Sequence, residues 1–393
     1  MKVTQALPTP SSSAIAHSEK LLQCIHDEIT QHSGAISFRR FMEMSLYEPA
    51  LGYYVAGQRK LGADGDFVTA PEISPLFSQC VANQCAQVLQ LLEDEDTPGD
   101  ILELGAGSGA MACELLLHLE KIGCLPDRYF ILDLSPDLQA LQRATFEQRA
   151  AHLLPHVQWL HSLEDTHFSG VILANEVLDA MPVERFRLRD GAIFQDQVGW
   201  QNNQLEIQPA PASPAVKAFV DGLGISSSEI YISEYNPAID SWIAQLSDCL
   251  QQGVMLLVDY GYTRQEYYHP QRNEGTLICH YQHLVHNDFF WHPGLQDITA
   301  NVDFTHVAAA AHKNALKISG FTTQAAFLAG CGLEALFMQA LTDCPDQQYP
   351  LAQQVRTLSL PSEMGERFKV IALNKGINAD LIGFSLIDYK HKL

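Results

Sequence analysis

A short glycine-rich stretch, ILELGAGSGA at residues 101–110, restricts the fold of this chain more than any other feature. Its first residues predict a buried strand, and the residues after them predict a tight loop that opens a helix. Gly105 and Gly107 allow the backbone to turn sharply and to approach a ligand closely. The first N–H groups of the helix have no partner within it. The stretch therefore indicates a ligand-binding crossover in an α/β protein, with an ordinary strand-to-helix connection as the alternative.

The segments after this loop alternate between two patterns. Short apolar runs predict strands, and stretches with helical spacing predict helices between them. The strands are expected at 129–133, 157–160, 171–174, 253–261 and 365–376, and the helices at about 110–122, 136–149 and 238–251. Strands that are apolar throughout and alternate with helices indicate a mostly parallel sheet that is covered on both faces. The chain is therefore expected to belong to the α/β class.

Composition excludes several classes of protein. The formal net charge of -22 argues against nucleic-acid binding, which needs a basic surface. The nine cysteines form no CxxC pair, which disfavours a zinc ribbon or a redox motif and fits reduced thiols. No apolar run approaches the roughly 20 residues of a membrane helix, and the N-terminus lacks the pattern of a signal or transit peptide. We therefore expect a cytoplasmic protein without membrane insertion.

The glycine loop fits two classes of cofactor. A dinucleotide site has the pattern G-x-G-x-x-G/A, which Gly105, Gly107 and Ala110 satisfy loosely. A site for S-adenosyl-L-methionine (SAM) resembles E/D-x-G-x-G-x-G, which is matched at every position by Glu103, Gly105, Gly107 and Gly109. A carboxylate beside the loop suits a ligand with an amine, such as the methionyl part of SAM, and repels a pyrophosphate. The loop, including Ala106, is therefore expected to bind SAM.

A second carboxylate ends the next expected strand. Asp133 in YFILDLSP can accept hydrogen bonds from both ribose hydroxyls, a role found in both NAD and SAM sites. Its alternative role is to cap the following helix, although Ser135 before Pro136 is better suited to that position. Asp133 and the adjacent Leu134 are therefore expected to contact the cofactor.

Beyond the glycine loop, the sequence resembles the MidA-like class I methyltransferases, which include the mitochondrial complex I assembly factor that methylates an arginine. The resemblance runs from about residue 37 to residue 375. It rests on separate blocks in one order: SFRRFMEMSLYEPALGYY, GDFVTAPEISPLF, LELGAGSG, ANEVLDAMPVERF, DYGYTRQEYY, RNEGTLICHYQH and GLQDITANVDF. Several such blocks are more specific than a glycine loop alone.

This resemblance implies a fold, a reaction and an acceptor. The fold is a Rossmann-like, mostly parallel seven-stranded sheet with an N-terminal helical region and insertions that form a substrate-binding subdomain. The reaction is SAM-dependent methylation of a protein arginine, with a respiratory complex I-type subunit as one implied acceptor. Two other functions stay open, a non-catalytic assembly chaperone and an NAD-dependent oxidoreductase, and a homodimer is also left open.

We expect the chain to divide into four segments. Loops and helices of the N-terminal region cover the cofactor site, a core binds SAM, an insertion forms the substrate subdomain, and a C-terminal part completes the sheet. The expected boundaries are 1–98, 99–264 with a β-like insertion at about 185–232, 265–330 and 331–393. Within the first segment, Ser37 is expected to cap a helix over residues 38–46.

An acidic cluster follows the expected strand at 171–174, in VILANEVLDAMPVERF. The resemblance places Asn175, Glu176 and Asp179 at the catalytic site. A guanidinium is protonated at neutral pH, and carboxylates can hold it in a bidentate arrangement with one nitrogen directed at the methyl donor. Glu176 is the first candidate, and Asp179 is the second if a helical turn puts residues i and i+3 on one side. The alternative is that Asn175 and Asp179 cap a helix.

Other blocks supply further candidates. Pro71-Glu72 does not suit the centre of a strand or helix, so this stretch is expected to lie over the cofactor, with Thr69, Pro71 and Glu72 as contacts. Candidates for binding the acceptor are Asp259, at the end of a strand, and the alternating Asp297, Thr299 and Asp303, which would share one strand face. For each stretch a purely structural role is the alternative. The histidines at 280, 283 and 286 lack a metal-binding pattern, so we expect no metal.

Overall fold

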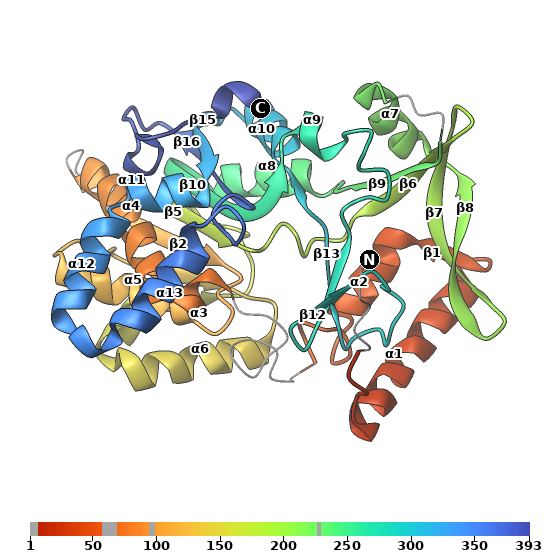
Figure 1. The fold of residues 1–393 in the computed structure, drawn as a ribbon, viewed down its shortest axis with the longest axis horizontal. Helices are drawn as coiled ribbons and strands as arrows, with labels where there is room; N and C mark the ends of the chain where they lie inside the picture. The colour runs from red at the N-terminus through yellow and green to blue at the C-terminus, as the bar shows by residue number, and fades with distance from the viewer. Residues whose placement is uncertain (1–6, 57–68, 94–98, 226–228) are drawn as a thin grey trace. The chain divides into compact units, whose positions relative to one another are not determined.

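The computed structural model describes residues 7–56, 69–93, 99–225 and 229–393 (Figure 1). By its internal contacts the chain forms two compact units. The core unit comprises residues 68–178, 239–264 and 302–393, and the accessory unit comprises residues 1–67, 179–238 and 265–301. These units group the residues differently from the four expected segments, and that four-part division stays a prediction.

A mostly parallel sheet forms the centre of the core unit. In the described residues it has the order β15-β16-β10-β5-β2-β3-β4, with β14 paired to β10 as an eighth strand. The pairs among β10, β5, β2, β3 and β4 are parallel, and β16 is antiparallel to both β10 and β15. The strands are β2 (Asp100–Leu104), β3 (Tyr129–Leu132), β4 (Val157–Leu160), β5 (Phe168–Asn175), β10 (Leu250–Tyr262), β14 (Val302–Asp303), β15 (Lys317–Thr323) and β16 (Phe368–Lys375). The α/β class is confirmed, with eight strands where seven were expected.

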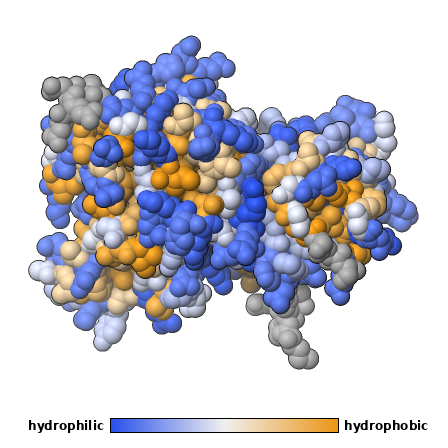
Figure 2. Space-filling model, turned by 90° about the horizontal axis from the view of Figure 1, so that it is seen from above, coloured by the Kyte–Doolittle hydropathy of each residue, from blue (hydrophilic) through white to orange (hydrophobic). Residues whose placement is uncertain are grey.

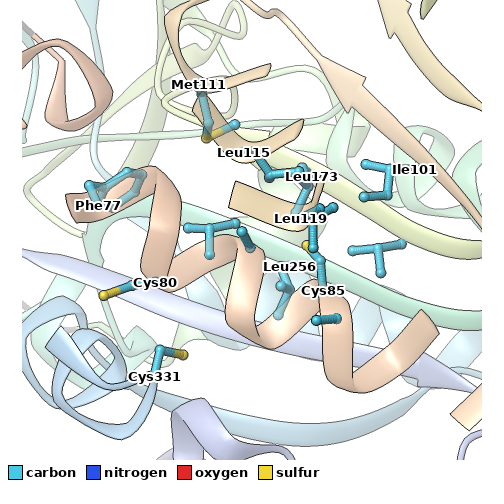
Figure 3. Close-up of a cluster of buried hydrophobic side chains, with 14 of the residues drawn as sticks. Phe77, Cys80, Cys85, Ile101, Met111, Leu115, Leu119, Leu173, Leu256 and Cys331 are labelled. Carbon is cyan, nitrogen blue, oxygen red and sulfur yellow. The ribbon is translucent and has the colours of Figure 1, made fainter. Parts of the chain in front are cut away.

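Helices pack against this sheet or against one another. Those of the core unit are α3 (Ala70–Ile73), α4 (Pro75–Glu93), α5 (Ala110–Lys121), α6 (Pro136–Arg149), α8 (Ile239–Cys249), α10 (Phe304–Lys313), α11 (Gln324–Gly330), α12 (Leu333–Asp343) and α13 (Gln348–Ser359). Figure 3 shows how α4 and α5 direct apolar side chains at strand residues such as Ile101, Leu173 and Leu256. β2 and β5 are buried along almost their whole length, and in β5 the residues Val171–Ala174 are a continuous apolar run, whereas β2 also buries the acidic side chains of Asp100 and Glu103.

The accessory unit has its own sheets and its own core. Strands β1 (Ala35–Ser37), β6 (Glu184–Arg189), β7 (Ala192–Gln201), β8 (Gln204–Pro211) and β9 (Tyr231–Tyr235) form an antiparallel sheet, and β11 (Ile278–Tyr281), β12 (Leu284–His286) and β13 (Asp297–Thr299) form a smaller one. Its helices are α1 (Ser12–Gln31), α2 (Phe38–Tyr47) and α7 (Pro214–Leu223), and α9 (Arg264–Tyr267) begins at the unit boundary. Ser37 accepts a hydrogen bond from Arg40 N, so the expected N-cap of α2 is confirmed.

Candidate active site

The register of the parallel strands brings the main candidate residues to one edge of the sheet. Leu104 of β2 lies opposite Leu132 of β3 and Ala174 of β5, and Ala174 lies opposite Leu257 of β10. Because these strands are parallel, the residue that follows each of these positions lies at the same edge of the sheet. These residues are Gly105, Asp133, Asn175 and Val258. In open α/β sheets, the carboxyl ends of the strands are where ligands bind.

The glycine loop connects β2 to α5, as the sequence predicted. Gly105, Gly107 and Gly109 all have positive φ, at 65°, 54° and 79°, a conformation that glycine adopts without steric cost. A Cβ atom at residue 109 would lie 3.1 Å from Gln142 Cα, and one at residue 105 would lie 3.2 Å from Val177 Cγ2. Both the backbone conformation and the available space therefore favour glycine.

Side chains from two helices hold this loop in place. On α6, Gln142 Nε2 donates to Gly107 O at 3.1 Å and Thr145 Oγ1 donates to Ser108 O at 2.7 Å. On α3, Glu72 Oε1 accepts a hydrogen bond from Ser108 Oγ at 2.9 Å. The segment that contains Glu72 was not expected at the centre of a helix, and it forms a four-residue helix in which Pro71 occupies the first turn, where a proline is tolerated. The Glu72 contact places this segment at the glycine loop.

Asp133 follows β3, and its carboxylate is already oriented by hydrogen bonds. Oδ1 accepts from Ser135 N at 3.0 Å, and Oδ2 accepts from Gln142 Nε2 at 2.9 Å. Burial raises the pKa of Asp133, while these two bonds lower it. Ser135, as expected, caps α6 by accepting from Leu138 N. Asp133 is therefore a fixed acceptor rather than a helix cap.

Leu134 is an exception to the burial of apolar residues in the core unit. The residue is 73% exposed, although it lies between Asp133 and the buried Ser135. Apolar residues also interrupt the polar surface on the face drawn in Figure 2. An exposed leucine beside an oriented carboxylate suits a ligand with both an apolar ring and a sugar.

Glu103 differs from its expected environment beside the loop. Its side chain is buried within β2, where it accepts a hydrogen bond from Tyr129 OH at 2.7 Å. Burial is the main cause that raises the pKa of Glu103 to about 7, while the Tyr129 hydrogen bond lowers it and the nearby Asp133 raises it. The amine-binding role of Glu103 stays a prediction, and its observed partner is a core tyrosine that sequence reasoning missed.

Glu103 is expected to make the protein less stable as the pH rises. Its pKa is 4.5 in the unfolded chain and about 7 in the folded protein, so between these values the folded state binds more protons. The stabilisation of the folded state that comes from this difference in pKa is fully present below pH 4.5 and is lost as the pH rises through 7. Free energies of unfolding from denaturant titrations between pH 4.5 and 8 should fall less steeply for Glu103→Gln than for the wild type. The exposed Glu147→Gln variant serves as the control, and equal slopes for Glu103→Gln and the wild type would contradict this assignment.

The residues after β5 form a strained corner. Glu176 has φ 54°, which is uncommon for a residue other than glycine, and its N–H donates to Val258 O at 2.9 Å. Asn175 Nδ2 donates to Glu176 Oε1 at 3.2 Å, and Asn175 Oδ1 is buried with no hydrogen-bond partner among the described residues. The helical turn on which the choice of Asp179 depended does not form, because residues 176–183 form bends and a turn. Glu176 belongs to the core unit, and Asp179 begins a segment of the accessory unit.

Asp259 is fully buried and holds backbone atoms. Its Oδ2 accepts from Leu178 N at 3.0 Å, and its Oδ1 accepts from Tyr260 N at 2.8 Å. Together with Val258 O, which accepts from Glu176 N, it ties the corner after β5 to the end of β10. Asp259 was expected to contact the acceptor, and the geometry fits a residue that positions the Glu176 corner.

The other expected acceptor residues do not share one strand face. Asp297 and Thr299 lie on β13 in the accessory unit, where both oxygens of Asp297 accept from Tyr54 OH at 2.9 Å. Asp303 ends β14 in the core unit, caps α10 by accepting from His306 N, and pairs with Arg264 at 3.2 Å. The single strand expected for the three residues is therefore wrong, because the chain changes strand and unit between Thr299 and Asp303.

No group of three or more histidine, cysteine or acidic side chains is arranged to hold a metal ion in the described part of the chain. His280 and His286 lie on the paired strands β11 and β12, and His283 lies in the turn between them. Burial lowers the pKa of His280 to about 4. Among the described helices, no single one is long and apolar enough to cross a membrane, and α11 with α12, bent by 69° at their junction, is the one pair that passes by length and composition.

Comparisons with known proteins agree on one family. Residues 80–322 match the model of the family described as "Putative S-adenosyl-L-methionine-dependent methyltransferase". A Burkholderia thailandensis protein solved with S-adenosyl-homocysteine bound is 38% identical, with a TM-score of 0.94 over 99% of this chain and 100% of that one. The curated protein arginine methyltransferase NDUFAF7 of Danio rerio is 27% identical over 92% of this chain and 88% of its own length. The homolog from Drosophila melanogaster is 27% identical over 98% and 93%.

These comparisons correct one expectation. Both curated relatives are named mitochondrial, as are those of Homo sapiens and other animals. The expectation of a cytoplasmic protein conflicts with these names and is wrong on this comparison. The absence of a recognisable targeting pattern was too weak an observation to carry it.

Proposed function

Because the chain belongs to this family of SAM-dependent methyltransferases, we propose that it transfers methyl groups to an arginine guanidinium of a protein. The observation that carries the proposal is the strained corner at Asn175–Glu176. A carboxylate stands there at the carboxyl end of β5, the strand beside the one that ends in the glycine loop. A non-glycine residue in left-handed backbone persists where the surrounding structure holds it, and such residues cluster at functional sites. The names of the curated relatives support the same reaction.

The residues at the edge of the core sheet fit SAM. Gly105, Gly107 and Gly109 leave the loop without side chains, so a ligand can approach its backbone closely. The oriented carboxylate of Asp133 would accept hydrogen bonds from the two ribose hydroxyls, and the exposed Leu134 would pack on the adenine ring. Ala106 completes the loop, and Glu72 fixes Ser108 from the side of α3. Thr69 and Pro71 belong to the same short segment and are proposed as its cofactor contacts.

When bound, SAM supplies an electrophilic methyl group on a sulfonium. Glu176 holds the protonated guanidinium with charge-assisted hydrogen bonds and aims one nitrogen at that methyl carbon. With SAM bound, the methyl group would pass from the sulfonium sulfur to that nitrogen, and Glu176 would accept at a carboxylate oxygen the proton that the nitrogen loses and pass it to water. Positioning of this kind supplies much of the rate in a displacement reaction.

The other candidate residues have separate proposed roles. Asn175 orients Glu176 through its side-chain amide. Asp179 stays the second proposed guanidinium-binding carboxylate on the family resemblance alone, because the helical turn that would put it on the same side as Glu176 does not form. Asp297 and Thr299 are proposed to contact the acceptor segment. Asp303 is better explained as the cap of α10 and the partner of Arg264, and Asp259 as the residue that positions the Glu176 corner. The acceptor is a protein that presents an arginine, with a respiratory complex I-type subunit as the first candidate.

Mass spectrometry of arginine methylation tests this function. Proteins from cells with and without the gene would be compared, and the purified protein would be incubated with methyl-labelled SAM and the peptides that lose methylation. We expect methylated arginines that disappear without the gene and reappear in vitro. Label found on other side chains or on small molecules would overturn the arginine assignment. Cells in which Glu176→Gln supports every function of the gene would favour the assembly chaperone instead.

A further inference from the structure

Gln142 is a buried polar side chain at the centre of the proposed cofactor site, and it was not among the residues expected from the sequence. It lies on α6 with no exposed surface. Its Nε2 donates to Asp133 Oδ2 at 2.9 Å and to Gly107 O at 3.1 Å, and its Oε1 accepts from Trp159 Nε1 at 2.9 Å. One side chain therefore connects the carboxylate after β3, the glycine loop and β4.

The amide nitrogen and the amide oxygen of Gln142 both have hydrogen-bond partners. A buried amide is costly unless its polar atoms are paired in this way. Trp159, the donor to Gln142, is itself held by the guanidinium of Arg143, which lies 3.7 Å from the centre of the indole ring. The Trp159 donor fixes the orientation of the amide, so that its NH₂ group faces Asp133 and Gly107.

Gln142 also sets how closely α6 approaches the loop. A Cβ at residue 109 would meet Gln142 Cα at 3.1 Å and its Cβ and Cγ at 3.3 Å. Thr145, one turn further along α6, holds the next carbonyl of the loop, that of Ser108. The loop therefore rests directly on this face of α6.

We propose that Gln142 is a positioning residue for the cofactor, one that orients the Asp133 carboxylate and the Gly107 peptide before SAM binds. The inference rests on the proposed contact of Asp133 with the ribose and does not depend on the methyl acceptor. A hydrogen bond from a neutral amide to a carboxylate favours the ionised form. Gln142 thereby keeps Asp133 ionised and able to accept hydrogen bonds from both ribose hydroxyls.

The pH dependence of cofactor binding separates this role from a purely structural one. Burial raises the pKa of Asp133, and the bonds from Ser135 N and Gln142 oppose that effect. Among the described residues, Asp133 also raises the pKa of Glu103 on β2, which accepts a hydrogen bond from Tyr129 of β3. Without the Gln142 bond, Asp133 protonates at a higher pH, and affinity for the cofactor starts to fall at a higher pH than in the wild type.

Isothermal titration calorimetry with S-adenosyl-homocysteine between pH 5 and 8.5 tests the inference on the full chain. Gln142→Leu should raise the Kd by about tenfold or more at pH 8. It should also raise the pH at which affinity begins to fall on acidification. Gln142→Glu keeps the size and shape of the side chain but adds a carboxylate beside Asp133. It should therefore raise the pH at which affinity begins to fall by more than Gln142→Leu does. The matched control is Gln139→Leu, because Gln139 lies on the same helix and donates to the backbone oxygen of Asp133 at 3.0 Å.

The possible outcomes are distinct. The inference is overturned if folded Gln142→Leu and Gln142→Glu bind with the wild-type Kd and pH profile, or if Gln139→Leu shows the same shift as they do. If Gln142→Leu does not fold, Gln142→Glu and Trp159→Phe, which removes the donor to Oε1, carry the test. A wild-type Kd for Asp133→Ala would instead remove the ribose contact on which the inference rests. None of these results depends on which side chain the enzyme methylates.

Discussion

Replacing Glu176 with glutamine is expected to lower kcat for methyl transfer by about 100-fold or more and to leave cofactor affinity nearly unchanged. The substitution keeps the shape of the side chain and its place after β5. It removes the negative charge that holds a guanidinium and the oxygen that accepts the proton after transfer. Rates with methyl-labelled SAM and an arginine peptide substrate, combined with calorimetric Kd values for S-adenosyl-homocysteine, measure both effects.

Two further variants show whether the loss comes from the carboxylate. Glu176→Gly removes the side chain and relieves the left-handed backbone at φ 54°, so it should be inactive without any loss in the free energy of unfolding. Glu147→Gln, on the exposed face of α6, should retain wild-type activity. Wild-type kcat in Glu176→Gln would rule out this residue as the guanidinium-binding group, whatever the cofactor affinity.

Replacing Asp133 with alanine is expected to weaken binding of S-adenosyl-homocysteine by about 100-fold. Two hydrogen bonds from ribose hydroxyls to a carboxylate are lost, and each such bond contributes about 1.5–3 kcal/mol. Water that fills the space left by the carboxylate can bond to the hydroxyls and offsets part of this loss. The carboxylate is held ready by Ser135 N and Gln142, so little ordering is needed on binding. Calorimetry of the variant and the wild type at pH 8 gives the ratio of Kd values.

A neighbouring acid provides the control for this loss. Asp137, exposed in the first turn of α6, lies four residues away in the sequence and has no part in the proposed site. Asp137→Ala should therefore bind S-adenosyl-homocysteine like the wild type. Asp133→Asn keeps the size of the side chain and one acceptor oxygen, and its Kd should fall between those of the wild type and Asp133→Ala. Unchanged affinity in Asp133→Ala would mean that the ribose lies elsewhere.

Residues whose role depends on a local pattern were predicted well. The glycine loop was found from its spacing because a strand, a tight turn and a helix start are encoded within ten residues. The order of apolar strands and helices indicated a mostly parallel sheet, which is confirmed. The helix cap at Ser135 followed from the serine before Pro136.

Residues whose role depends on distant partners were not predicted. Gln142 gave no signal in the sequence, because its partners lie 9, 17 and 35 residues away and meet it only when α6 packs on the sheet. The helical turn that would have put Asp179 on the same side as Glu176 does not form, because hydrogen bonds to the end of β10 hold those residues in another conformation. The alternation of Asp297, Thr299 and Asp303 likewise gave no sign that the chain changes strand after Thr299.

The sequence by itself determined the fold class and the kind of cofactor loop, because both follow from backbone preferences and burial patterns of neighbouring residues. Only the tertiary structure decided what surrounds each carboxylate. Glu103 meets Tyr129 across paired strands, Asp133 meets Gln142, and Asp259 meets the backbone of Leu178, 81 residues away. Strand register and helix packing fix these partners, and the partners set which acids are buried, oriented or left to act on a ligand.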